Sequence, residues 1–152
     1  MELLHARGQV VSEPEIRLTR YTKDFSWGFY CTTNFRQAAK WAKRRKGIPT
    51  INYYRYEENP GLNILKFDSM SDEWLDFIAN CRNGIVHDDD IVEGPLADDD
   101  IWDWVKLYLS GRMSREAFFA QAKFNYPTHQ TCFCTVRALR CLTYERSESL
   151  AD

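Results

Sequence analysis

The sequence lacks the features that mark membrane proteins and secreted proteins. It has no run of about 18 consecutive apolar residues, so we expect no helix that spans a membrane. The first residues, Met1 to His5, have neither the basic start nor the long apolar stretch of a secretory signal. The five cysteines are an odd number for a disulfide framework. Together these absences predict a reduced, cytoplasmic protein.

Strong positive charge and common ligand motifs are also missing. The net charge is −2 at pH 7, so no overall positive field attracts nucleic acid, which leaves open an enzyme that touches only a few nucleotides. There is no glycine-rich phosphate loop. The spacing of His129, Cys132 and Cys134 lacks a clear fourth zinc ligand. The aspartates at 88–90 and 98–100 lack the pattern of a calcium loop, so we interpret them as solvated loop charge or as charge at a helix start, and we expect no metal site.

What is present fits a single globular domain, residues 1–152. The 152 residues are 44% hydrophobic and 14% aromatic, and they contain no internal repeat, low-complexity tract or linker. This many aromatic rings usually fill cores and pockets. Strand-like and helix-like segments follow one another without strict alternation, which favours an α+β fold over a doubly wound sheet.

Apolar periodicity and turn residues predict the individual elements. Strands are expected at 2–6, 51–56, 62–67, 90–93, 131–134 and 141–144, the last followed by a polar tail. Helices are expected at 35–46, from about 72, and at 101–109, 115–123 and 136–140, whereas residues 10–22 are expected to be irregular. Candidate N-caps precede these helices at Thr32 to Asn34, Ser71, Ser114 and Thr135.

Three blocks of residues carry a resemblance to a known superfamily. His5 ends the first predicted strand, Ser26 to Thr32 follows, and His129 to Cys134 comes near the C-terminus. In this order they resemble the diphtheria-toxin-like and PARP-like ADP-ribosyltransferases, whose signature is a strand-borne His, then G-x-G-[IF]-Y, then a Glu at a strand start.

The chain is more closely similar to a family of small bacterial proteins placed in that superfamily. The matching segments are Asp24 to Thr33, Ala38 to Ala42, Asp72 to Phe77, Asp90 to Asp99, Tyr108 to Gly111 and His129 to Thr135. The resemblance spans Leu4 to about Leu142. It implies an ADP-ribosyltransferase-like split β-sandwich of mainly antiparallel strands with surrounding helices, and NAD as the substrate without a metal.

The resemblance implies roles for the first block. His5 would hold a ribose hydroxyl of NAD. Ala6 stands where relatives have Gly, and its backbone N–H and C=O could still bind the nicotinamide amide if no positive φ is needed. Arg7, Arg17 and Arg20 are candidates for the pyrophosphate, with ordinary surface arginines as the alternative.

The second block would supply the aromatic part of the site. Tyr30 matches the tyrosine that stacks on nicotinamide. Trp41 matches a second aromatic on the other side of the base, or else packs its helix against a sheet. Gly28 matches the glycine that lets the backbone approach the ligand, and Ser26 stands where the pattern often has another Gly.

Gln130 matches the third position, where most relatives that transfer ADP-ribose efficiently have Glu. A carboxylate there can stabilise the positive charge that develops on the ribose, whereas Gln can bind a hydroxyl but supplies no full charge. The loss could cost about 100-fold in rate or more. Transfer would remain possible with a good acceptor nucleophile or with help from a second acid, such as Glu93 or Asp98.

The predicted catalytic residues are therefore His5, Tyr30 and Gln130, in a mono-ADP-ribosyltransferase that acts on a protein or nucleic acid. The basic run Lys43 to Lys46 makes RNA or DNA conceivable as the acceptor. Small bacterial relatives resemble toxins of toxin–antitoxin or phage-defence loci, which implies a role in antiviral defence and an antitoxin protein as partner. The alternatives are an NAD glycohydrolase and a non-catalytic module that binds NAD or ADP-ribose.

Overall fold

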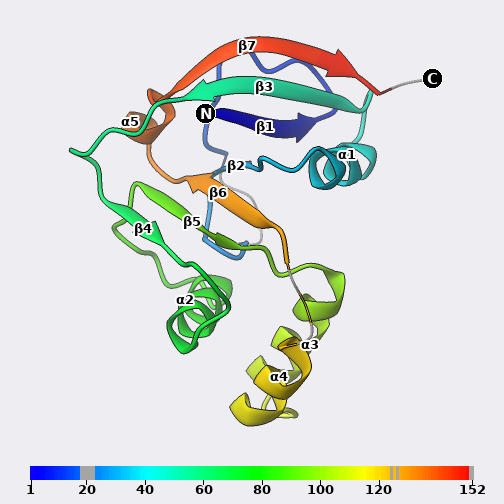
Figure 1. Ribbon diagram of the computed structural model, residues 1–152, viewed down its shortest axis with the longest axis vertical. Helices are drawn as coiled ribbons and strands as arrows, with labels where there is room; N and C mark the ends of the chain where they lie inside the picture. The colour runs from blue at the N-terminus through cyan, green and yellow to red at the C-terminus, as the bar shows by residue number, and fades with distance from the viewer. Residues whose placement is uncertain (18–22, 124, 126, 151–152) are drawn as a thin grey trace.

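The computed structural model describes residues 1–17, 23–123, 125 and 127–150. In these residues the chain forms seven strands and five helices (Figure 1). The strands are β1 (Glu2–Arg7), β2 (Phe29–Cys31), β3 (Thr50–Tyr56), β4 (Ile64–Lys66), β5 (Ile91–Pro95), β6 (His129–Phe133) and β7 (Leu142–Ser149). The helices are α1 (Phe35–Lys43), α2 (Asp72–Arg82), α3 (Asp99–Leu109), α4 (Arg115–Ala122) and α5 (Val136–Leu139).

The strands form two sheets, which confirms the predicted α+β class. One sheet has the order β1-β3-β7 and the other the order β2-β6-β5-β4. All strand pairs are antiparallel except β4 with β5, which is parallel. One core cluster takes buried side chains from both sheets, including Leu3, Phe29, Tyr54 and Phe133. The two sheets are therefore packed on a shared core.

Local sequence explains where the helices begin. Asn34, Ser71, Asp98, Ser114 and Thr135 each accept a hydrogen bond from a backbone N–H in the first turn of the helix that follows. Such a cap stabilises a helix by about 1 kcal/mol. The predicted starts of α1, α2, α4 and α5 are confirmed. Helix α3 begins at Asp99, two residues before the predicted start, and α1 ends at Lys43 rather than at residue 46.

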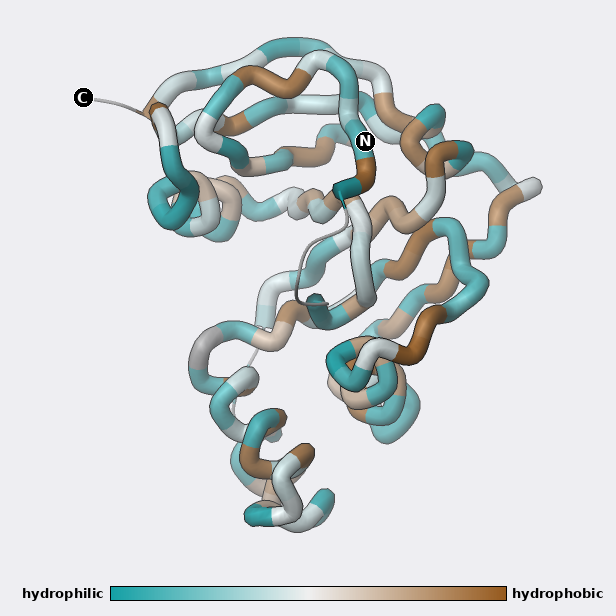
Figure 2. The backbone as a smooth tube through the Cα atoms, turned by 180° about the vertical axis from the view of Figure 1, so that it is seen from behind, coloured by the Kyte–Doolittle hydropathy of each residue, from teal (hydrophilic) through white to brown (hydrophobic). Residues whose placement is uncertain are grey.

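Three parts of the strand prediction were wrong. No pattern in the sequence predicted the three-residue strand β2, which is held by its pairing with β6. Gly94 and Pro95 continue β5, where a stop was expected, because β5 pairs with β6 up to Pro95 at its end. The tail after residue 144 continues β7 to Ser149, and Figure 2 shows this outer strand to be mostly hydrophilic. An exposed edge strand needs no apolar face, so its polar composition conceals it.

A single bridge joins the two sheets beside β1 and places the candidate site. Leu4 N–H donates to the Thr32 carbonyl at 2.8 Å, and Thr32 N–H donates to the Leu4 carbonyl at 2.9 Å. Thr32 follows β2, so this bridge ties the edge of one sheet to the edge of the other. No helix in the described part of the chain is long and apolar enough to cross a membrane.

Candidate functional site

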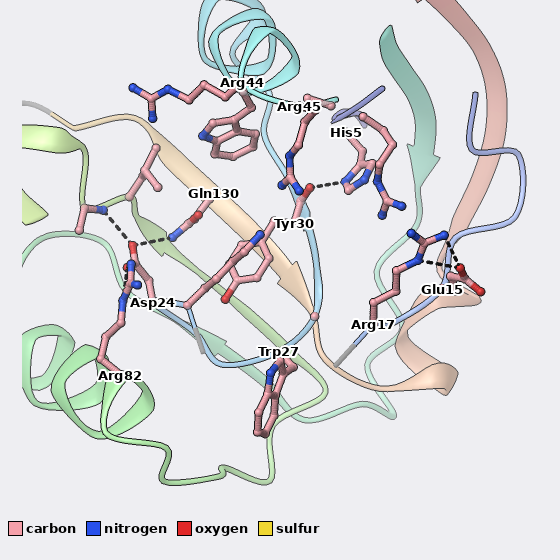
Figure 3. Close-up of a pocket in the computed structure, with 17 residues that line it drawn as sticks. His5, Glu15, Arg17, Asp24, Trp27, Tyr30, Arg44, Arg45, Arg82 and Gln130 are labelled. Carbon is pink, nitrogen blue, oxygen red and sulfur yellow. Dashed lines mark hydrogen bonds and ion pairs between the residues drawn. The ribbon is translucent and has the colours of Figure 1, made fainter. Parts of the chain in front are cut away.

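A pocket of about 540 Å³ brings the predicted site residues together (Figure 3). Its volume falls within the roughly 300–1,000 Å³ typical of sites for small molecules and cofactors. The pocket is lined by seven of the residues that the sequence predicted for substrate binding, namely His5, Ala6, Arg7, Gly28, Tyr30, Trp41 and Gln130. They come from β1, β2, β6, α1 and the loop before β2.

His5 has one ring nitrogen fixed and the other without a partner. Its Nδ1 lies 2.7 Å from the Tyr30 carbonyl oxygen, which can only accept, so Nδ1 carries the proton. The ring stacks on Phe29 with centroids 3.7 Å apart. Burial lowers the pKa of His5 to about 3, so the ring is neutral at physiological pH. Buried Nε2, which has no hydrogen-bond partner among the described residues, is therefore an acceptor suited to a ligand hydroxyl.

Tyr30 contributes its ring to the pocket, because its hydroxyl is already engaged. The hydroxyl donates to the Ser26 carbonyl at 2.5 Å and accepts from Phe25 N–H at 3.0 Å. Burial raises the pKa of Tyr30 well above its usual value. Lys23 Nζ lies 5.2 Å from the ring centroid, within cation–π range. Tyr30 is thus a fixed flat surface rather than a proton donor.

The turn before β2 explains the glycine pattern in this block. Ser26 has φ 74°, which makes it the only non-glycine residue with positive φ in the described ranges. This left-handed backbone favours glycine, which is what the resembled signature often has at this position. At Gly28 a Cβ would lie 2.3 Å from Cys132 Sγ and 2.8 Å from the Phe133 carbonyl oxygen. The close approach that requires Gly28 is therefore to β6.

Ala6 offers backbone groups at the open edge of β1. Leu4 uses its N–H and C=O to bind Thr32, on the side away from β3. Backbone groups alternate between the two edges of a strand, so those of Ala6 face the same edge as those of Leu4. Ala6 also lines the pocket and has no positive φ. The backbone of Ala6 could therefore bind the nicotinamide amide, because the position does not need the positive φ that would favour glycine.

Gln130 is held by a carboxylate that the sequence analysis missed. Gln130 Nε2 donates to Asp24 Oδ2 at 3.2 Å, and both side chains are buried (Figure 3). Asp24 Oδ2 also accepts from Ala97 N–H at 3.1 Å, and Asp24 Oδ1 accepts from Arg82 Nε at 3.1 Å and Nη2 at 2.5 Å. The only available signal was that Asp24 opens the block of residues that runs to Thr33.

The acids that the sequence offered as helpers lie elsewhere. Asp98 caps α3 through the Ile101 N–H, and Glu93 pairs with Thr131 within the sheet. Neither lines the pocket, whereas Asp24 does. The carboxylate beside Gln130 is therefore contributed by the loop before β2 and is 106 residues away in sequence.

The pocket lining carries an excess of positive charge. Six cationic residues line it, against two carboxylates, Glu15 and Asp24. The cations are Arg7, Arg17, Lys23, Arg44, Arg45 and Arg82. Each carboxylate is already paired, Glu15 with Arg17 at 2.8 Å and Asp24 with Arg82.

Two of these cations show the effect of crowding in their pKa values. Burial lowers the pKa of Arg7, and Arg17 and Arg45 lower it further. Burial and then Arg45 lower the pKa of Lys23 to about 8. An anionic ligand would relieve this repulsion. Arg7 and Arg17 were predicted for such a role, and Arg20 lies outside the described residues.

The basic run at Lys43 to Lys46 is partly a pocket feature. Arg44 and Arg45 follow α1 and line the pocket together with Trp41 from the same helix. In Figure 3, Arg44 and Arg45 lie on the α1 side, above Gln130 and Tyr30. The sequence identified the run but gave no reason to place it at the site.

The described residues contain no group of three or more His, Cys, Asp or Glu side chains placed to hold a metal ion. Cys132 and Cys134 are close, with Sγ atoms 3.3 Å apart, and all five cysteines are free. The Cys132 thiol, followed by His87, lowers the pKa of Cys134 to about 6. None of these three residues lines the pocket.

The chain belongs to the family described as "Protein of unknown function (DUF3990)", whose model matches residues 1–144. That match covers nearly the whole chain, including every element that contributes to the pocket. Comparison with curated proteins and with solved structures found no match.

Proposed function

We propose that the protein is a mono-ADP-ribosyltransferase that binds NAD in this pocket and transfers ADP-ribose to a macromolecule. The observation that carries the proposal is the convergence of His5, Tyr30 and Gln130, which are far apart in sequence, on one cationic pocket. Two sheets of mainly antiparallel strands around the pocket agree with an ADP-ribosyltransferase-like split β-sandwich.

Three parts of NAD, namely a ribose, the nicotinamide and the pyrophosphate, have a chemical counterpart in the lining. His5 Nε2 can accept a hydrogen bond from a ribose hydroxyl. The face of Tyr30 suits the flat nicotinamide ring, with Trp41 also present, and the backbone of Ala6 suits its amide. The arginines and Lys23 suit the pyrophosphate, because a paired phosphate offsets their crowded charge.

The reaction breaks the bond between the ribose and nicotinamide. Nicotinamide leaves as a neutral molecule with the bonding electrons, and the positive charge spreads over the ribose. A nucleophile of the acceptor then forms the new bond to the same ribose carbon and releases its proton to solvent. Gln130 Oε1 would hold a ribose hydroxyl during this step, which fits single transfer rather than polymer building.

The acceptor and the biological role follow from resemblance rather than from geometry. We include in the proposal a bacterial toxin in the cytoplasm, neutralised by an antitoxin protein, with antiviral defence as one setting. Either a protein or a nucleic acid could be the acceptor. Arg44 and Arg45 at the pocket favour testing RNA and DNA alongside protein.

Incubation with NAD labelled in its adenylate part tests the proposal. Label that moves onto a macromolecule from a lysate supports transfer, and free ADP-ribose alone supports NAD glycohydrolase activity. Tight NAD binding without nicotinamide release would overturn both enzymatic functions and leave a binding module. Treatment of the labelled product with protease or nuclease then identifies the class of acceptor.

Two variants test the site itself. Tyr30→Ala should abolish NAD binding, whereas Tyr30→Phe keeps the ring and should retain it. His5→Ala should abolish nicotinamide release, with His87→Ala as the control because His87 does not line the pocket. Wild-type turnover in both Tyr30→Ala and His5→Ala would rule out this pocket as the site.

A further inference from the structure

We propose that Asp24 is a positioning residue that orients Gln130 and places a negative charge behind its amide, so that the two residues together replace a single catalytic carboxylate. This inference rests on the proposed function and extends it to a residue that the sequence did not suggest. It is based on the hydrogen bond from Gln130 Nε2 to Asp24 Oδ2, buried at one side of the pocket (Figure 3).

Asp24 determines which end of the Gln130 amide faces the pocket. A carboxylate paired with an arginine only accepts hydrogen bonds, so it selects the NH₂ group of the amide. The carbonyl oxygen Oε1 is then directed away from Asp24. Without Asp24 the amide could turn over and present a donor instead. Asp24 thus makes Gln130 a fixed acceptor for a ligand hydroxyl.

The charge of Asp24 is only partly offset by its partners. Arg82 binds Oδ1, whereas Gln130 and the Ala97 N–H share Oδ2. The side chain of Arg82 is 23% exposed and that of Asp24 is 3% exposed, so solvent screens the arginine more than the carboxylate. Arg82 also stacks over the Trp102 ring, 3.8 Å from its centroid, which holds it on the side of α3.

Hydrogen bonding to a carboxylate polarises the amide. Donation from Nε2 to Asp24 shifts electron density toward Oε1, because hydrogen bonds in a chain strengthen one another. A ribose hydroxyl bound to Oε1 would then experience part of the Asp24 charge. This supplies the electrostatic stabilisation that Gln130 alone lacks, as positive charge develops on the ribose.

The pairing leads to a counterintuitive expectation for Gln130→Glu. That substitution restores the residue of the superfamily pattern, but it places a second carboxylate beside Asp24 at about 3 Å. Two carboxylates that close repel each other, so the pair is unfavourable near neutral pH until one of them takes up a proton as the pH falls. Combining it with Asp24→Asn exchanges the two groups and restores one amide and one carboxylate, with the charge now on residue 130.

The experiment compares wild type, Asp24→Asn, Gln130→Glu and the double variant. Nicotinamide release with saturating acceptor gives kcat and the KM for NAD, and denaturant unfolding gives the midpoint of each protein. We expect kcat to fall about 10- to 100-fold in each single variant, with KM within about threefold of wild type, since the loss lies in the transition state. The double variant should recover at least tenfold over either single variant.

A pH profile separates positioning from a purely structural role. Gln130→Glu should gain activity as the pH falls, because one of the two carboxyl groups takes up a proton, whereas wild type and the double variant should not. This readout stands even if Asp24→Asn does not fold. Wild-type kcat in Gln130→Glu, or a double variant as impaired as the two single losses combined, would overturn the proposal.

Failure of the proposed function would be recognised separately. If wild type neither binds NAD nor releases nicotinamide, the proposed function is wrong and the catalytic role of Asp24 falls with it. The pairing is still decided by unfolding, where Gln130→Glu should lower the denaturant midpoint at pH 7 and the double variant should raise it again. Independent effects of the two substitutions would overturn the pairing itself.

Discussion

Two buried aspartates, Asp24 and Asp90, look alike by burial and partner type but differ in where their networks end. Asp90 accepts from Arg137 Nε at 2.8 Å and Nη2 at 2.7 Å, from Thr135 Oγ1 at 2.7 Å and from the Asn63 N–H at 3.0 Å. All of these partners are structural, and they tie the start of β5 to α5 and to the approach to β4.

Asp24 also has an arginine and a backbone N–H, but one of its bonds goes to Gln130 in the pocket wall. Burial and an arginine partner therefore do not distinguish a structural carboxylate from a functional one. The distinguishing feature is hydrogen-bonding capacity left over at a cavity, as at His5 Nε2.

Asp90→Ala should give the largest loss of stability. The substitution removes the carboxylate and leaves Thr135 and the Asn63 N–H without their partner, which should lower the free energy of unfolding by about 2–4 kcal/mol. Arg137 is 56% exposed and can turn to water, which limits the cost. Denaturant unfolding measures the change.

The same variant should leave the affinity of the folded protein for NAD unchanged, since Asp90 does not line the pocket. Asp24→Asn should show the opposite balance, with a larger effect on nicotinamide release than on unfolding. Loss of NAD binding in folded Asp90→Ala would remove the distinction between the two aspartates.

His5 should make the protein less stable in mild acid. Burial lowers its pKa to about 3 in the folded protein, whereas a histidine in the unfolded chain titrates near 6.5. Between these values only the unfolded chain binds the proton, so stability is full above pH 6.5 and is lost as the pH falls. The slope of the free energy of unfolding against pH approaches about 1.4 kcal/mol per pH unit, so the expected loss at pH 5.5 is about 1.4 kcal/mol.

Unfolding of wild type and His5→Gln from pH 7.5 to 4.5 tests this expectation, and the variant should have a flatter profile. Asp90→Asn is the comparison, because Arg137 holds the pKa of Asp90 well below its usual range. The contribution of Asp90 is present above about pH 4 and is lost only below it. An unchanged slope in His5→Gln would show that this histidine is not the buried neutral group described here.

The contrast also shows how far the sequence could lead. That His5, Tyr30 and Gln130 line one pocket could be predicted from the resemblance, because each lies in a block whose order along the chain is distinctive. The bond between Asp24 and Gln130 could not, because it joins residues 106 positions apart and neither periodicity nor spacing encodes that contact.

The same limit applies to the fold. Helix starts were predictable because a cap and its partner N–H lie three residues apart. The strand β2 and the part of β7 beyond Tyr144 were not, since β2 has three residues and β7 lies at a sheet edge with few buried positions. Their strand geometry depends on pairing with β6 and β3, which is a tertiary effect.

Ser26→Gly should give the smallest effect, a gain of about 0.5–1 kcal/mol in the free energy of unfolding. Ser26 has φ 74°, a conformation that costs an L-residue roughly 1–2 kcal/mol. Glycine removes this cost, but its greater conformational entropy in the unfolded chain offsets part of the gain. Its carbonyl would still accept from the Tyr30 hydroxyl, so NAD affinity should stay within about twofold.

Ser26→Ala is the matched control, because it removes the hydroxyl but keeps the Cβ that disfavours positive φ. It should give no gain in stability. If Ser26→Gly were no more stable than Ser26→Ala, the turn that joins Asp24 to Tyr30 would not be strained at this residue. A gain in Ser26→Gly with unchanged nicotinamide release would instead show that the backbone strain at Ser26 has no role in function. The proposed function would then depend on the hydrogen-bonding atoms that His5 and Gln130 leave unpaired in the pocket.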